Sequence, residues 1–157
     1  ITIGNQHMKF YYNFIISLFL VSSFSSSQAN PNSDPISQAM KTMDKFIEAF
    51  NARDIQSWSE SLNYPHVRFA SGGVKVWKDP ETFIAETDLT PLINSGWDHS
   101  HWISRDVVLS SPSKVHISTN FQRFNKDNRL ISTYQSLYIV TLVDGHWGIQ
   151  ARSSLAP

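Results

Sequence analysis

The chain has 157 residues, enough for one domain, and its 13 lysines and arginines balance 13 aspartates and glutamates. It has no basic block and no stripe of aromatic residues alternating with lysine or arginine, which argues against nucleic acid as a partner. It contains no cysteine, so disulfides and lipid attachment at a cysteine are excluded.

The N-terminal part of the sequence has the pattern of a secretory signal peptide. A positive region begins at Met8-Lys9, a mostly apolar run covers Phe14 to Val21, and Ser27-Gln28-Ala29 supplies the small residues that a signal peptidase reads. That run would reach only about 12 Å as a helix, too short for a membrane span. We therefore expect residues 1–29 to be upstream sequence and signal peptide, with a mature start near Asn30. The exported protein would be periplasmic or secreted, without a stable membrane anchor.

Helices are expected at the start of the folded domain, which we place at residues 36–157 after a linker of residues 30–35. Asp34-Pro35 has the N-cap and first-turn proline of a helix start. The stripe that follows has helical spacing and consists of Met40, Met43, Phe46, Ile47 and Phe50. Asp54 can cap a second, shorter helix that Tyr64-Pro65 would end, because proline disfavours helix at the preceding residue.

The rest of the sequence predicts one more helix and several strands. Residues 66–71 and 74–78 flank Gly72-Gly73, which is typical of a tight hairpin. Asp79-Pro80 begins a third helix that runs to about Thr87, and residues 89–95 are expected to be irregular. Period-two alternation then predicts a meander with strands at residues 101–110, 114–124, 130–143 and 146–154. Helices first and a sheet after is an α+β plan.

This order of elements resembles the nuclear transport factor 2-like superfamily, which includes ketosteroid isomerase, scytalone dehydratase and the SnoaL-like polyketide cyclases. The resemblance covers roughly residues 36–155. It rests on Phe46–Ile55 at the first helix junction, Asp79–Phe83 at the start of the third helix, and Val143–Ile149 at the last hairpin. It implies a cone-shaped, curved antiparallel sheet with three N-terminal helices packed on its concave face. Enzymes of the superfamily place their acids and bases on the inner wall of the cone.

The positions that resemble the catalytic residues of ketosteroid isomerase are apolar in this sequence. That enzyme uses a carboxylate base and two neutral donors, a tyrosine and a protonated aspartate. The resemblance places the tyrosine at Phe46, the base near Phe69 and the protonated aspartate near Leu137. A shift of one residue brings no carboxylate to either of the last two positions. Isomerisation by this route is therefore not expected.

His101 is the candidate catalytic residue, because it resembles a histidine that the dehydratases of the superfamily project into the cone. The position of a second such histidine falls near Thr119. Imidazole titrates near neutrality and can serve as a general acid or base, with Asp98 or Asp106 as its orienting carboxylate. His99 and His101 also form a pair facing one side of a strand, but a zinc site needs three or four converging ligands. No metal site and no cofactor are expected.

The expected pocket is largely apolar and takes a small apolar molecule. Its ligand-binding residues are expected to be Phe46, Phe50, Tyr64, Phe69, Trp97, Gln135 and Leu137. With Leu137 facing the cone, alternation turns Tyr134 and Tyr138 outward, which indicates a homodimer interface on the outer sheet face. Cover of that face by the C-terminal segment is the alternative.

Three strand arginines are candidates for binding a ligand carboxylate: Arg68, Arg123 and Arg152. Arginines on strands are more often solvated or paired, so both interpretations stay open.

Three functions remain open at this point. The chain is an exported small-molecule-binding domain, a cofactor-free lyase, isomerase or cyclase that uses His101, or a homodimeric assembly module without a ligand. An open pocket holding His101 beside a carboxylate favours the enzyme, an open dry pocket favours binding, and a filled cone favours assembly.

Overall fold

The computed structural model describes residues 34–156, so the predicted signal peptide and mature start lie outside the described residues. The helices are α1 (Pro35–Ala52), α2 (Ile55–Glu60), α3 (Pro80–Glu86) and α4 (Thr90–Asn94). The strands are β1 (Leu62–Ala70), β2 (Gly73–Trp77), β3 (His99–Ser111), β4 (Lys114–Phe124), β5 (Leu130–Val143) and β6 (His146–Ser154). Over residues 34–156, none of the helices combines the length and the apolar character that crossing a bilayer requires.

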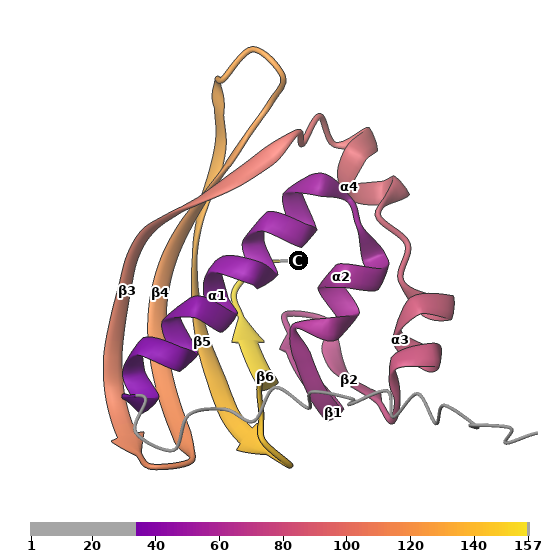
Figure 1. The fold of residues 1–157 in the computed structure, drawn as a ribbon. Coiled ribbons are helices and arrows are strands. Elements are labelled where there is room, and N and C mark those ends of the chain that lie inside the picture. The colour runs from indigo at the N-terminus through magenta and orange to yellow at the C-terminus, as the bar shows by residue number, and fades with distance from the viewer. Residues whose placement is uncertain (1–33, 157) are drawn as a thin grey trace, which may run out of the picture.

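The strands form one curved sheet in the order β2-β1-β6-β5-β4-β3, which is not closed, so β2 and β3 are its edges (Figure 1). Neighbouring strands are antiparallel except β1 and β6, which run parallel. The predicted α+β fold is confirmed. The sheet keeps the predicted meander, and the parallel contact joins the N-terminal hairpin to the last strand.

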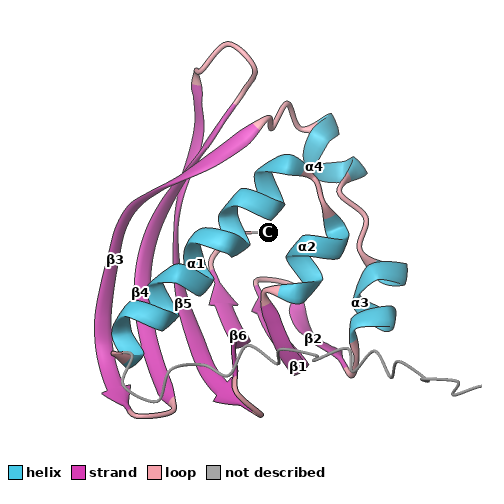
Figure 2. Ribbon diagram, viewed as in Figure 1, coloured by secondary structure: helices cyan, strands magenta, loops and turns pink. Residues whose placement is uncertain are grey.

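Helix α1 crosses the concave side of the sheet (Figure 2). Its start follows the predicted cap, since the Asp34 carboxylate accepts hydrogen bonds from the backbone N–H groups of Ile36 and Ser37. It ends at Ala52, and the C-cap residue Arg53 adopts the left-handed conformation with φ 59°. Its buried face runs along the predicted stripe and comprises Ala39, Thr42, Met43, Phe46 and Ala49.

The junction after α1 docks the helix onto β3. The amide of Asn51 donates to the backbone oxygen of Ser100 at 2.9 Å and accepts from the backbone N–H of Ser100 at 2.9 Å. Trp97 is buried, and its Nε1 donates to Ser100 Oγ at 2.9 Å. These three hydrogen bonds hold Ser100 against the helices and thereby set which residues of β3 face inward.

Two boundaries differ from the prediction. Helix α2 ends at Glu60, and Tyr64-Pro65 lies inside β1, joined by a cis peptide bond, rather than ending the helix. The strand already pairs with β6 at Leu62, opposite Ile149, so pairing with β6 sets the boundary instead of the proline. Residues 89–95 were expected to be irregular but contain α4, a single short turn of helix with proline in its first turn.

The core lies between α1 and the concave face of the sheet. Its fully buried side chains come mainly from α1, β4, β5 and β6, and include Met43, Val115, Ile117, Tyr138, Val140 and Ile149. Phe83 of α3 is also buried and brings the second half of the helical layer to the same core. The space between α1 and the sheet is therefore filled by core side chains. The part of the concave face next to α3 and α4 holds an open cavity.

Candidate functional site

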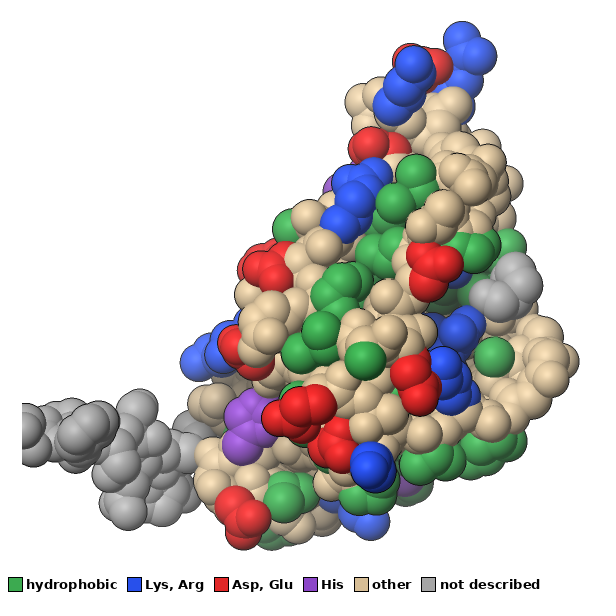
Figure 3. Space-filling model, turned by 90° about the vertical axis from the view of Figure 1, so that its right-hand side faces the viewer, with side chains coloured by type: hydrophobic (Ala, Val, Ile, Leu, Met, Phe, Trp, Pro, Cys, Tyr) green, Lys and Arg blue, Asp and Glu red, His purple; other side chains and the backbone are tan. Residues whose placement is uncertain are grey.

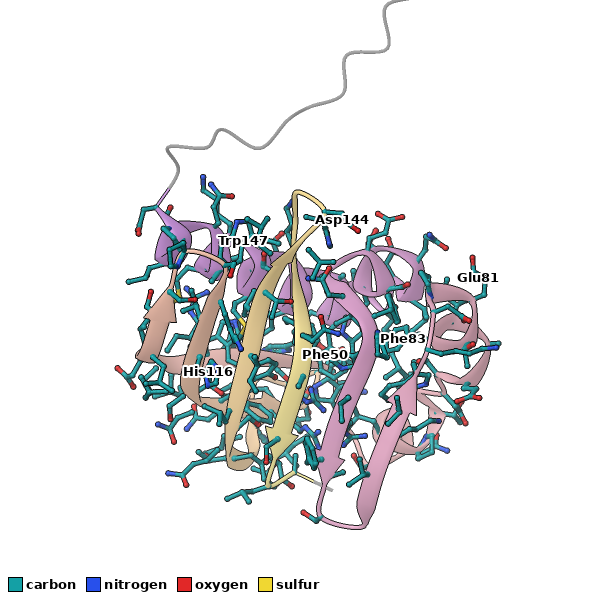
Figure 4. The ribbon with its side chains drawn as sticks, turned by 90° about the horizontal axis from the view of Figure 1, so that it is seen from below. Phe50, Glu81, Phe83, His116, Asp144 and Trp147 are labelled. Carbon is teal, nitrogen blue, oxygen red and sulfur yellow. The ribbon has the colours of Figure 1, made fainter. Side chains whose placement is uncertain are left out.

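A cavity of about 480 Å³ opens on the concave face, between the sheet, α1 and the α3–α4 segment. This volume lies within the roughly 300–1,000 Å³ of small-molecule sites. Aromatic side chains dominate its wall: Phe46, Phe50, Trp58, Trp77, Phe83, Trp102, Phe121 and Tyr138. Figure 4 shows Phe50 and Phe83 in the interior between sheet and helices.

The aromatic wall is a continuous set of ring contacts. Phe46 meets Trp58 and Tyr138 edge-on, with ring centroids 5.6 Å apart in each pair. Phe50 packs against Trp58 at 4.9 Å and Trp97 at 4.7 Å. Edge-to-face and tilted contacts of this kind add to the burial energy of each ring and leave little rotational freedom. The apolar surface that a ligand would meet is therefore preorganised.

Three arginines reach the same cavity from three strands: Arg68 from β1, Arg152 from β6 and Arg123 from β4. Arg68 and Arg152 are direct neighbours across the parallel pair of strands, and Arg152 in turn lies opposite Tyr138. The Arg152 guanidinium carbon lies 5.9 Å from the Phe46 ring centroid, and its Nη1 is 3.5 Å from the Tyr138 hydroxyl. The cationic part of the wall thus continues directly into the aromatic part.

Burial disfavours the charge of the Arg68 and Arg123 guanidinium groups. Burial, followed by repulsion from Arg152 and Arg123, lowers the pKa of Arg68 to about 10. Burial is also the main cause that lowers the pKa of Arg123. Near neutral pH these side chains remain protonated. Positive charge is therefore held in a half-buried site at a cost in free energy.

His66 is a buried polar residue of the same wall. Its Nδ1 lies 2.9 Å from the backbone oxygen of Ile149, which can only accept, so Nδ1 carries the proton and donates. Burial lowers the pKa of His66 to about 4, with a further contribution from the positive charges of Arg152 and Arg68. The ring stacks on Trp77 at 5.7 Å. His66 is a neutral wall residue at physiological pH.

The structure brings two of the predicted ligand-binding residues, Phe46 and Phe50, to the cavity. Trp97 lies behind Phe50 as a buried core residue. Tyr64 lies at a different depression, a wide groove of about 1,000 Å³ among α1, α2 and β1, where its hydroxyl is 2.9 Å from Ser59 Oγ. That groove is lined mostly by polar side chains, so the concave cavity is the stronger candidate for an apolar ligand.

Four predicted site residues face away from the cavity, and here the sequence interpretation was wrong. Phe69 is 48% exposed and Leu137 is 37% exposed, and Gln135 and His101 are exposed as well. For three of them an adjacent residue lines the cavity instead: Arg68 beside Phe69, Tyr138 beside Leu137 and Trp102 beside His101. Successive strand residues point to opposite faces, so a displacement of one residue reverses every assignment on that strand.

His101 therefore lies on the outer face of β3. Its ring contacts His99 at 4.9 Å and Phe124 at 5.6 Å, and the carboxylate of Asp98 bonds His99 rather than His101. The hydrogen bonds that turn Ser100 inward explain this orientation, because they set the alternation of the strand start. Within residues 34–156, no three His, Cys, Asp or Glu side chains lie together in a way that could hold a metal ion.

The predicted dimer face also needs correction. Tyr138 is only 1% exposed and packs on Phe46 and Trp102, so it belongs to the core. Tyr134 packs against Phe121 of the cavity wall, with ring centroids 5.6 Å apart. Neither tyrosine lies on the outer face of the sheet.

The sequence of β4 contains an alternating pattern from which the inward face of that strand could have been predicted. Its buried and cavity-lining residues alternate without interruption: Val115, Ile117, Thr119, Phe121 and Arg123. Continuing that pattern places Arg123 inside. Strand β5 gave no such signal, since both of its faces carry large apolar residues.

A family profile described as "NTF2-like protein (DUF6841)" matches residues 37–156. The chain belongs to this NTF2-like family. No protein among curated sequences matches it. NTF2-like proteins often bind small molecules or act as isomerases, so a concave pocket is the expected place for a function.

Solved structures share the fold at low sequence identity. A protein of unknown function with a cystatin-like fold, from Nostoc punctiforme PCC 73102, has a TM-score of 0.64 at 10% identity, over 78% of this chain and 90% of that chain. An NTF2-like protein of unknown function from Shewanella oneidensis MR-1 has a TM-score of 0.62 at 13% identity, over 78% and 99%. A ketosteroid isomerase-like protein from Erwinia carotovora atroseptica SCRI1043 has a TM-score of 0.58 at 15% identity, over 80% and 99%. These similarities support the fold and not an activity.

Proposed function

We propose that this NTF2-like chain is a small-molecule-binding domain whose ligand occupies the concave cavity. The observation that carries the proposal is the preorganised aromatic wall of a cavity of about 480 Å³. On the side of the molecule that bears α3 and α4, hydrophobic side chains also reach the surface among acidic and basic ones (Figure 3). A ligand with an apolar body fits such a wall.

Binding is favoured over catalysis by the groups that face the cavity. His66 is tied to the Ile149 carbonyl and stays neutral, and His101 lies on the opposite face. Two carboxylates reach the rim, but Glu86 forms an ion pair with Lys75 at 3.2 Å, and Asp88 accepts from the Thr90 backbone N–H at 2.8 Å. None of these groups forms the acid–base pair that a lyase, isomerase or cyclase needs.

Tryptophan fluorescence tests this proposal, because Trp58, Trp77 and Trp102 line the cavity. Titration with a naphthalene compound should change the emission saturably, and Trp102→Phe should reduce the change. His101→Ala serves as the control on the outer face and should bind as the wild type does. Loss of binding in His101→Ala, with Trp102→Phe unaffected, contradicts the proposed site.

We also propose that the domain is exported and self-associates. The pattern of residues 1–29 supports export, and the intact mass of secreted protein tests it by showing cleavage after Ala29. A row of outer-face residues supports a homodimer, since Phe69 and Leu137 both lie beside Ser153 on neighbouring strands and are both exposed. Light scattering after size exclusion should give twice the chain mass, and Leu137→Lys should give a monomer.

A further inference from the structure

The three arginines of the cavity wall bring like charges close together, which is unfavourable for folding unless something compensates it. Arg68 and Arg152 lie directly opposite each other on adjacent strands and project into the same cavity. Like charges opposite one another on one sheet face are destabilising. Arg123 adds a third positive charge close enough to lower the pKa of Arg68. The cluster concentrates positive charge on one part of a largely aromatic wall.

Acidic side chains do not neutralise the whole cluster. None of the ion pairs formed within residues 34–156 involves Arg123 or Arg152. In the same region the buried Nε atoms of Arg123 and Arg152 have no hydrogen-bond partner. A buried charged donor without an acceptor is costly, and no carboxylate of residues 34–156 forms an ion pair with either guanidinium.

Arg123 and Arg152 contact aromatic side chains, through their rings and, for Arg152, also through the Tyr138 hydroxyl 3.5 Å from Nη1. Arg123 lies 5.0 Å from the Tyr134 ring centroid, and Arg152 lies 5.8 Å from that of Tyr138. Stacking on rings orients a guanidinium and leaves its N–H edge available for an oxyanion. The rim carboxylates Glu86 and Asp88 are engaged with Lys75 and the Thr90 backbone, as described above.

We infer that the ligand of this cavity is a small organic acid, with an apolar body against the aromatic wall and an oxyanion against the arginine cluster Arg68, Arg123 and Arg152. This inference rests on the proposed binding function and specifies its ligand class. A carboxylate or phosphate can accept paired hydrogen bonds from the planar guanidinium fork, in a site where water competes poorly. The rings around Phe46 and Phe50 then bury the rest of the molecule.

Isothermal titration with matched naphthalene compounds tests the inference. The probes are 2-naphthoate, 2-naphthyl phosphate and neutral 2-naphthamide, each titrated into the full domain. At least one anion should bind tenfold or more tightly than the amide, and the tighter of the two identifies the oxyanion. Raising the salt concentration should weaken binding of the anions and leave the amide unchanged.

Arginine variants give the second measurement. Arg152→Met and Arg123→Met keep an apolar side chain of similar length, and each should weaken anion binding about tenfold while retaining amide binding. Arg129→Met is the matched control, because Arg129 is exposed in the β4–β5 loop, and it should bind as the wild type does. Thermal melting of each variant confirms that it is folded.

The outcomes separate the two proposals. If the amide binds as tightly as both anions, or if neither cluster variant changes anion binding, the inference is overturned while the binding function stands. If none of the three probes binds, the proposed function itself is overturned.

Discussion

Protonation of His66 should destabilise the folded domain between about pH 6.5 and pH 4. The folded-state pKa is about 4, whereas an exposed histidine has 6.5. Above pH 6.5 the residue is neutral in both states, so it contributes no pH dependence. As the pH falls below 6.5, His66 becomes protonated in the unfolded chain but stays neutral in the folded protein. The free energy of unfolding therefore decreases until the pH reaches the pKa of the folded state.

The magnitude follows from the size of the shift. Each pKa unit is worth about 1.4 kcal/mol, so a shift of this size corresponds to roughly 3 kcal/mol in full. Linkage gives a loss of about 1.4 kcal/mol by pH 5.5 and about 2.5 kcal/mol by pH 4.5. The caps Asp54 and Asp79 titrate in a different range, because their hydrogen bonds lower the pKa of each carboxyl below 3.8.

Urea unfolding at pH 7.5, 5.5 and 4.5 measures this loss. His66→Gln keeps an N–H donor for the Ile149 carbonyl but cannot titrate, so its stability should change by less than about 1 kcal/mol over the same range. His101→Gln is the control, since this exposed histidine should leave the acid-induced loss as large as in the wild type. Equal pH dependence of the wild type and His66→Gln would refute the reasoning.

Three further predictions concern stability. Gly148→Ala should destabilise the domain by about 1–3 kcal/mol in urea unfolding, because the new Cβ would lie 2.7 Å from Asn63 and the Leu62 backbone; unchanged stability would mean that β1 and β6 can separate freely. Asp79→Ala should cost about 1 kcal/mol, since the carboxylate accepts from the Thr82 backbone N–H at 2.7 Å, and Asp79→Asn should restore most of it. Arg152→Met without ligand should raise the melting temperature, because it removes a like charge beside Arg68; a lower melting temperature would show that the contacts of Arg152 with Phe46 and Tyr138 outweigh that repulsion.

The sequence predicted the elements well because their signals are local. Asp34, Asp54 and Asp79 each cap the helix that they were expected to cap. The four meander strands lie within two residues of the predicted bounds. Caps and alternation depend on neighbouring residues, which a single sequence contains.

Which residues of each strand point into the cavity could not be predicted in the same way. It depends on contacts between distant residues, such as the hydrogen bonds of Asn51 with Ser100 and the pairing of Arg68 with Arg152. On β5 the pattern was ambiguous, and choosing Leu137 as the inward residue placed Tyr138 on the wrong face. The candidate site changed with it, from a wall with histidine and glutamine to one with three arginines.

The parallel pairing of β1 with β6 determines when the cavity can exist during synthesis. Arg68 is made more than half of the domain earlier than Arg152, yet the two lie side by side. Because β6 occupies the middle of the sheet, β1 and its hairpin have no strand to join until residues 146–154 have been made. The N-terminal hairpin therefore cannot pair with the rest of the sheet before β6 has been made, and Arg68 and Arg152 cannot lie side by side until then.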